Sequence, residues 1–432
     1  MALNRRQFLI GGLGAAAATM GLSACGGGSD GGGSGGSGDS ASLQFAWWGN
    51  EVRNKNTAAA IDAYTKAHPN IKVAQQPGEF STYWDKLATQ TAGNKAPDII
   101  QMDMAYISEY GKRKALLDLE KYGADVSKFV EGSVDSGRID GKLVGINAGI
   151  NTPVILMNPA VFAKAKVAEP DDKTWTWDQM KQVGAEIAAK GGSGTVGMQS
   201  PFVDAMLSAF LRQNGKELFN DSGLGFDVPD VVPWFQMVAD FAAAKAIPSA
   251  SQITEEQAKS LDQQALATGK AGMAMFWSNQ VEAVNKASGT EMKVLRFPSV
   301  SGNATERKAW YKASMLWSAS SRTKNPEAVV QMINWWVNSP ECANINLAER
   351  GVPPNTEMLA AIKPKLSPAQ AAVAKFIEDI KPELAATPIA PPPGGGKIGD
   401  IMNRHQGDLL FGRTNPADAA AKFVDEAKSN LK

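Results

Sequence analysis

The fold is decided by two segments, LQFAWW at residues 43–48 and PDIIQM at residues 97–102. Both are short, apolar and rich in aromatic or β-branched residues, a pattern that predicts strands. Between them, helices are predicted at residues 53–67 and 83–92, separated by a short strand at residues 71–73. The order strand, helix, strand, helix, strand predicts a βαβ sheet and places the chain in the α/β fold class.

The ends of these strands supply the first candidate binding residues. Ligands of βαβ sheets bind beyond the carboxyl ends of the strands, which places Trp48, Asn50 and Asp103 near a cleft. Side chains alternate along a strand, so Trp47 is expected in the core when Trp48 faces the cleft. Two alternatives stay open, because Asp103 could instead cap the next helix and Asn50 could form a turn.

Two lobes are expected from the length of the chain. Its 432 residues exceed what one hydrophobic core usually serves. Strand-like segments at residues 154–157 and 271–276 and a helical pattern at residues 325–337 continue the alternation. The second of these strands leads into Trp277 and Asn279, which are two further candidates for the cleft.

The composition narrows the classes of function. Lys and Arg together number 44, as do Asp and Glu, so the chain has no basic excess to hold nucleic acid. Two Cys and two His argue against a disulfide framework and against a His-rich metal site, and no cofactor is expected. Eleven Trp is a high count, and the large flat face of this side chain suits a binding cleft.

The first forty residues are typical of an export signal. Paired arginines at residues 5–6 precede a Gly/Ala/Leu-rich run that ends in Leu22–Cys25, and this run is too short and too rich in glycine for a transmembrane helix. The arginines resemble a twin-arginine signal, and Leu-Ser-Ala-Cys resembles a lipobox whose Cys25 carries a lipid. We therefore expect a signal peptide at residues 1–24, a Gly/Ser-rich tether at residues 25–42, and a protein anchored to the outer face of the cytoplasmic membrane.

Seven segments spread along the rest of the chain carry a family resemblance. They are WWGN at residues 47–50, APDIIQMD at 96–103, LLDL at 116–119, WTWD at 175–178, FWSN at 276–279, SRTKNPEA at 321–328 and ERGVP at 349–353. In order and spacing they resemble the family 1 extracellular solute-binding proteins of ATP-driven sugar importers, which are broadly similar to maltose-binding protein.

The resemblance implies two α/β lobes of the type II periplasmic-binding-protein kind, joined by several crossing segments and closing on a ligand between them. The first lobe would comprise residues 43–150 and 299–340, and the second residues 151–298 and 341–432. It also implies a monomer that passes a sugar or oligosaccharide to the permease subunits of an ABC transporter. Members that import fragments of plant polysaccharides, including pectic ones, are the most similar.

Further candidates follow from the chemistry of sugars. A sugar presents an apolar C–H face and a rim of hydroxyls, so its site needs aromatic rings and polar groups. Trp310 and Tyr311 precede a strand-like stretch, and one of the two is expected to face the cleft. Arg53, Arg350 and Lys312 could bind the carboxylates of a pectic fragment. For the two arginines a structural ion pair is the alternative.

Two other functions remain open at this point. An exported glycosidase or lyase would need paired carboxylates, which a chain with many Asp and Glu does not exclude. The GxSxG pattern occurs only within the Gly/Ser-rich tether, at residues 27–31 and 32–36, where no strand precedes it, and the sequence contains no HExxH or P-loop motif. We assign no catalytic residue. A binding protein for a peptide or a metal chelate is the other alternative, although the few His and Cys argue against a metal and the many Trp favour a carbohydrate.

Overall fold

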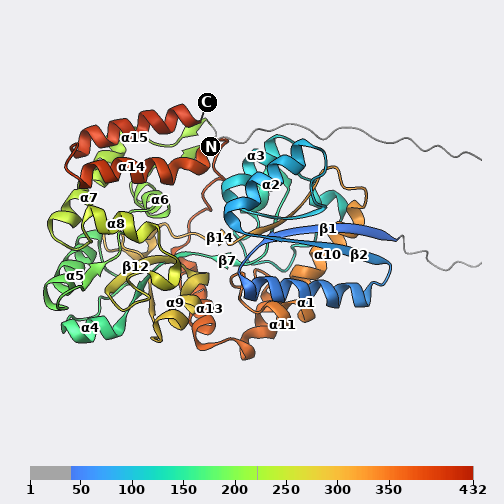
Figure 1. The fold of residues 1–432 in the computed structure, drawn as a ribbon, viewed down its shortest axis with the longest axis horizontal. Coiled ribbons are helices and arrows are strands. Elements are labelled where there is room, and N and C mark those ends of the chain that lie inside the picture. The colour runs from blue at the N-terminus through green and yellow to red at the C-terminus, as the bar shows by residue number, and fades with distance from the viewer. Residues whose placement is uncertain (1–39, 221, 432) are drawn as a thin grey trace, which may run out of the picture. The chain divides into compact units, whose positions relative to one another are not determined.

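Two sheets organise residues 40–220 and 222–431, the part of the chain that the computed structural model describes. Each sheet has its own helices, which confirms the expected α/β fold with two lobes (Figure 1). The predicted export signal, Cys25 and the tether as far as residue 39 lie outside the described residues. Within the described part, none of the helices combines the length and the apolar character needed to cross a membrane.

The sheet of the first lobe has the strand order β2-β1-β3-β15-β6. These strands are β1 (Ala41–Trp48), β2 (Ile71–Gly78), β3 (Ile99–Met102), β6 (Ile146–Asn147) and β15 (Leu316–Ala319). Strand β1 pairs in parallel with both β2 and β3, which confirms the βαβ prediction. Strand β15 runs antiparallel to β3 and returns the chain to this sheet late in the sequence.

Helices cover both faces of the first sheet. Trp47 is buried on the face that packs against α1 (Glu51–Ala67), as predicted, whereas Trp48 packs on the opposite face with α2 (Phe80–Ala92) and α3 (Met104–Lys112). The other helices and the small hairpin of this lobe are α10 (Pro326–Asn338), α11 (Pro340–Asn346), α12 (Thr356–Ile362), β4 (Arg138–Ile139) and β5 (Lys142–Leu143).

The sheet of the second lobe has the strand order β13-β8-β12-β9, so β9 is an edge strand. Its strands are β8 (Pro153–Met157), β9 (Val196–Met198), β12 (Ala271–Trp277) and β13 (Lys293–Leu295). The helices of this lobe and its small hairpin are α4 (Pro159–Ala165), α5 (Trp177–Lys190), α6 (Asp204–Gln213), α7 (Val228–Ala243), α8 (Ala250–Gln257), α9 (Val281–Ser288), α13 (Pro368–Asp379), α14 (Ile398–Leu410), α15 (Pro416–Asn430), β10 (Phe219–Asn220) and β11 (Gly223–Leu224).

Short strands mark where the chain passes from one lobe to the other. Strand β7 (Ile150–Asn151) pairs antiparallel with β14 (Lys312–Ala313) and also forms a bridge with Val352 (Figure 1). Glycine is required for this close approach. A Cβ atom on Gly149 would lie 2.0 Å from the carbonyl oxygen of Arg350, just before the bridge at Val352. Gly351 has a φ of +100°, which favours glycine.

Two of the expected lobe boundaries need correction. Residues 299–340 were assigned to the first lobe, but Trp310 and Tyr311 are buried in the core of the second lobe. The chain therefore stays in the second lobe until β14, where it passes to the first. Cys342 is buried in the core of the first lobe, which therefore extends beyond residue 340. The expected boundary after residue 150 falls within β7.

Candidate ligand-binding site

Lys312, the first residue of β14, lies between side chains of the two lobes. Its Nζ is 3.9 Å from Oδ2 of Asp103, which follows β3 of the first lobe. The same atom lies 4.8 Å from the centre of the ring of Trp277, which ends β12 of the second lobe. The ammonium thus joins the two lobes through an ion pair and a cation–π contact. Because the side chains of Lys312 and Asp103 stay 21% and 18% exposed, a ligand can reach them.

Asp103 uses its two carboxylate oxygens differently. Its Oδ1 accepts a hydrogen bond of 2.9 Å from the N–H of Ala105 and caps α3, whereas its Oδ2 faces Lys312. The cap fixes the orientation of the carboxylate and leaves one oxygen for the cleft. The two alternatives that the sequence left open for this residue are therefore compatible.

A second carboxylate, that of Asp204, interacts electrostatically with Lys312 and Asp103 and was not predicted from the sequence. Asp204 begins α6, and its carboxylate accepts a hydrogen bond from the N–H of Ala205. The residue keeps exposed surface, yet desolvation by the surrounding protein raises the pKa of its carboxyl above the usual value. Here two carboxylates lie near one ammonium.

An aromatic cluster lies beside Asp103 in the first lobe. Trp48 is only 7% exposed, and its ring is enclosed by Tyr83, Trp84 and the exposed Phe80. Trp84 in turn stacks on Tyr106, with ring centres 3.8 Å apart. Tyr106 follows Asp103 closely on α3, and its pKa is raised by desolvation and by the negative charge of that carboxylate. Trp48 and the buried Tyr83 therefore support the more accessible rings of Phe80, Trp84 and Tyr106. The clustering of Phe80, Tyr83 and Trp84 directly after β2 was the signal that could have identified them.

The two predicted asparagines have structural partners. Asn279 accepts a hydrogen bond of 2.9 Å from the side chain of Asn151, and its own N–H donates to that side chain at 3.0 Å. This pair ties the end of β12 to the crossing strand β7. Asn50 caps α1, because its side chain accepts a hydrogen bond of 2.9 Å from the N–H of Arg53. A local capping role fits the alternative that the sequence left open for Asn50.

Both predicted arginines are held inside the first lobe, which corrects the expectation that they face an acidic ligand. The guanidinium of Arg53 pairs with Glu349 at 3.0 Å. Arg350 is 2% exposed, donates to Thr57 at 2.7 Å, and lies over the rings of two tryptophans. Its burial lowers the pKa of the guanidinium to about 9. Arg350 also pairs with Glu349, at 3.6 Å, so both residues form the structural ion pair that was their alternative.

Neither Trp310 nor Tyr311 faces the cleft, although one of the two was expected to. Each is 4% exposed in the core of the second lobe. The hydroxyl of Tyr311 donates a hydrogen bond of 2.7 Å to the carbonyl of Ile377, and the guanidinium of Arg212 lies 5.4 Å from the ring centre of Trp310. Only the next residue, Lys312, reaches the site, because β14 leaves the second lobe there.

Comparison with known families identifies the type of protein. The model of the bacterial extracellular solute-binding protein family matches residues 59–375. The chain belongs to this family. The arabinooligosaccharide-binding protein of Bacillus subtilis is 27% identical over 40% of this chain and 43% of its own length. A putative ABC transporter periplasmic-binding protein of Escherichia coli is 22% identical over 66% of this chain and 65% of its own length. The aligned part thus spans less than two thirds of either relative.

Solved structures of solute-binding proteins share the fold over nearly the whole chain. A family 1 extracellular solute-binding protein of Alicyclobacillus acidocaldarius has a TM-score of 0.71 and 25% identity, covering 92% of this chain and all of its own. The oligogalacturonide-binding protein of Yersinia enterocolitica, solved with saturated digalacturonic acid, has a TM-score of 0.78 and 19% identity, with 90% and 100% coverage.

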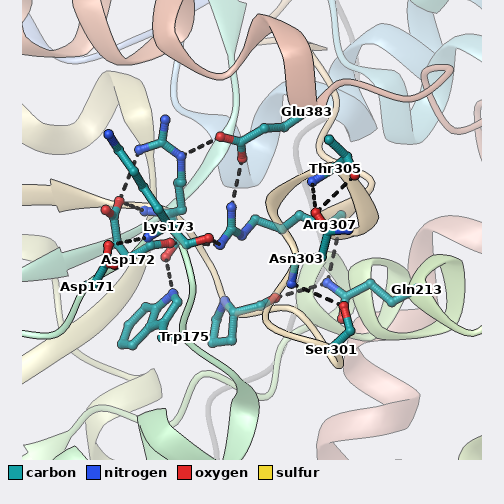
Figure 2. Close-up of polar contacts among 12 residues, drawn as sticks. Asp171, Asp172, Lys173, Trp175, Gln213, Ser301, Asn303, Thr305, Arg307 and Glu383 are labelled. Carbon is teal, nitrogen blue, oxygen red and sulfur yellow. Dashed lines mark hydrogen bonds and ion pairs between the residues drawn. The ribbon is translucent and has the colours of Figure 1, made fainter.

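In this solute-binding protein, buried charges fix the segment that leads into β14 (Figure 2). The carboxylate of Glu383 accepts hydrogen bonds from Arg296 at 2.6 Å and from Arg307 at 2.9 Å. Arg296 also pairs with Asp172 at 3.3 Å, and Arg307, with no exposed surface, donates to the carbonyl of Asp172 at 2.7 Å. These contacts hold residues 296–307 against the second lobe and so help to set the position of Lys312.

Proposed function

We propose that this solute-binding protein captures a sugar or oligosaccharide between its lobes and delivers it to the permease of an ABC transporter. The observation that carries the proposal is the contact of Lys312 with Asp103 of one lobe and Trp277 of the other. A ligand bound at this point touches both lobes and can hold them together. The name of the Bacillus subtilis relative supports an oligosaccharide as the ligand.

The side chains of the site suit the surface of a sugar. The half-buried ring of Trp277 offers an apolar face for the C–H side of a sugar ring. Asp103 and Asp204 accept hydrogen bonds from hydroxyls, and Lys312 donates them. Such hydrogen bonds to charged groups contribute about 1.5–3 kcal/mol each, more than those between neutral groups.

The charge of the site favours a neutral ligand over an acidic one. With Arg53 and Arg350 engaged inside the first lobe, Lys312 is the cation that remains at the described site, and it lies near Asp103 and Asp204. A uronic acid would bring a third carboxylate next to these two, and like charges at close range repel. We therefore propose a neutral oligosaccharide, which can still be derived from a plant polysaccharide, in place of a pectic fragment.

The remaining parts of the proposal concern the place and the mode of action. The twin-arginine signal and the lipobox with Cys25 support export and anchoring by a lipid to the outer face of the membrane. The protein works as a monomer and binds its ligand without altering it, as the family assignment favours. Replacing Cys25 with Ala is expected to release the protein from the membrane, which fractionation of cells would detect.

The test is a thermal-shift and calorimetry screen of the purified protein with neutral and acidic oligosaccharides. We expect at least one neutral oligosaccharide to bind and to be recovered unchanged, and uronic acid oligomers not to bind. Lys312→Met should weaken this binding about tenfold or more, because a hydrogen bond to a charged donor is lost. Lys428→Met, at an exposed surface ion pair, is the control and should bind like the wild type. Tighter binding of uronic acid oligomers would contradict the neutral ligand.

A further inference from the structure

The second lobe contains a large groove that the site described above does not include. It has a volume of about 660 Å³, within the range of small-molecule sites, and lies between the edge strand β9 and the helices α8 and α14. Helix α8 forms an outer wall and has no buried residue of its own. Every residue that lines the groove belongs to the second lobe, so the groove is distinct from the contact between the lobes at Lys312.

The lining of this groove is unusually rich in carboxamides. They are Gln199, Gln252, Gln257, Gln264, Gln280, Asn403 and Gln406. Gln199 uses both its donor and its acceptor within the protein, with Gln264 and with the N–H of Leu266. The acceptor oxygens of Gln252, Gln264 and Gln280 are also engaged, so these side chains offer their amide N–H donors to the hydroxyls of a sugar. Phe202, Met275 and Phe276 add apolar surface. The lining also includes three lysines and two glutamates, of which Lys259 and Glu256 pair at 2.8 Å. Because these charges of opposite sign nearly balance, the carboxamides and the apolar groups suit a neutral, hydroxyl-rich ligand.

The groove comes close to the candidate site. Gln280, which lines it, accepts a hydrogen bond of 3.0 Å from the N–H of Trp277, and Val203, which also lines it, precedes Asp204. Helix α14 connects the two regions. A Cβ atom on Gly399 would lie 3.7 Å from the carboxyl carbon of Asp204, and Asn403, one turn later, lines the groove.

The same face of α14 continues along the groove. Gly407 and Leu410 also line it, and with Gly399 and Asn403 they follow the three-to-four residue spacing of one helix face. From Gly399 to Leu410 this face extends about 16 Å at the usual rise of the helix, enough for more than one sugar unit.

We propose that this groove is a second part of the binding site, which takes the further units of an oligosaccharide whose first unit lies at Trp277 and Lys312. The inference rests on the proposed function. A groove of this kind makes the protein selective for chain length, because a short ligand leaves the groove empty and does not form hydrogen bonds there. The groove accepts neutral units, in keeping with its carboxamides and with the charge of the main site.

Gly407 offers a way to block the groove without disturbing the fold. A Cβ atom at this position would have nothing within 4 Å, and replacement of a helical glycine favours the helix. Gly407→Trp should fill the groove, whereas Gly407→Ala makes the same backbone change without filling it. Both variants should melt at or above the temperature of the wild type.

The experiment measures the affinities of arabino-, malto- and galacto-oligosaccharides, each from disaccharide to hexasaccharide, by calorimetry. In the wild type, affinity should rise with chain length for the series that binds. Gly407→Trp should weaken the longest ligand of that series at least tenfold and leave the shortest unchanged, and Gly407→Ala should change neither. Equal affinities of Gly407→Trp and the wild type at every length would overturn the groove proposal alone. Failure of every series to bind the wild type would overturn the proposed function and this inference with it.

Discussion

At the scale of single residues, Trp277 is the ring on which the binding proposal depends most. It is half-buried at the end of β12, next to Lys312. Trp277→Ala should weaken binding of the oligosaccharide about tenfold, since an aromatic contact contributes about 0.5–1.5 kcal/mol beyond the apolar area it buries. Calorimetry would measure the loss, and Trp277→Phe, which keeps a ring, should lose less. Normal affinity in the alanine variant would remove Trp277 from the site.

Asp204 makes the stability of the protein depend on pH in a defined direction. Because the pKa of its carboxyl is raised on folding, the folded state holds the proton more tightly than the unfolded state. Stability is therefore lost as the pH rises from the usual aspartate range through the raised pKa. Asp204→Asn cannot ionise, so its stability relative to the wild type should increase over this range and then level off. Urea denaturation at a series of pH values would show this, and a difference independent of pH would contradict it.

Local rules of sequence identified some of the site and missed the rest. Alternation along a strand separated Trp47 from Trp48, and the rule for strand ends located Asp103. Asp204 was missed because nothing in its own segment shows that the start of α6 meets the crossing strand. Arg350 was misassigned for the same reason, since its partners come from other parts of the chain. Long-range contacts decide both cases.

At the scale of elements, the charges around Glu383 secure the segment that leads into β14. Arg307 has no exposed surface, so Glu383→Ala would leave a buried guanidinium without its counter-charge. Removing one partner of such a pair costs about 3–5 kcal/mol, and the free energy of unfolding should fall by this amount. Chemical denaturation would measure it, with Lys428→Ala at an exposed pair as the control, expected to change stability by less than about 1 kcal/mol. Equal effects of the two variants would show that the network is not needed for stability.

Elements with a clear pattern were predicted correctly, and those at the crossings were not. Strands β1 and β3 were recognised from their apolar runs, and the helix at residues 325–337 matches α10. The boundary at residue 299 failed because an aromatic stretch such as the one at residues 310–311 can pack in the core of either lobe. Which core it joins is determined by tertiary packing, here by the contact of Tyr311 with α13.

At the scale of the whole molecule, the proposal requires the two lobes to close on the ligand. Ligand that binds only the folded protein, at a hundredfold excess over its dissociation constant, adds about 2.7 kcal/mol to the free energy of unfolding. The melting temperature should therefore rise by several degrees, since each kcal/mol corresponds to roughly 2–4 °C in domains of about 150–250 residues. The intrinsic fluorescence should change over the same range of ligand concentration, because Trp277 lies at the site.

Closure itself has a separate signature, which small-angle scattering would record. The crossing at β7 and β14 is narrow and contains Gly149 and Gly351, so a modest change of backbone angles there can rotate one lobe against the other. The radius of gyration should fall when the same oligosaccharide is added, and Lys312→Met should reduce the fall at equal ligand concentration, because less of the protein is occupied. A ligand that raises the melting temperature without compacting the protein would leave the binding site in place and refute the hinge. Compaction without any rise in melting temperature would contradict binding to the folded protein alone, because such binding must raise it.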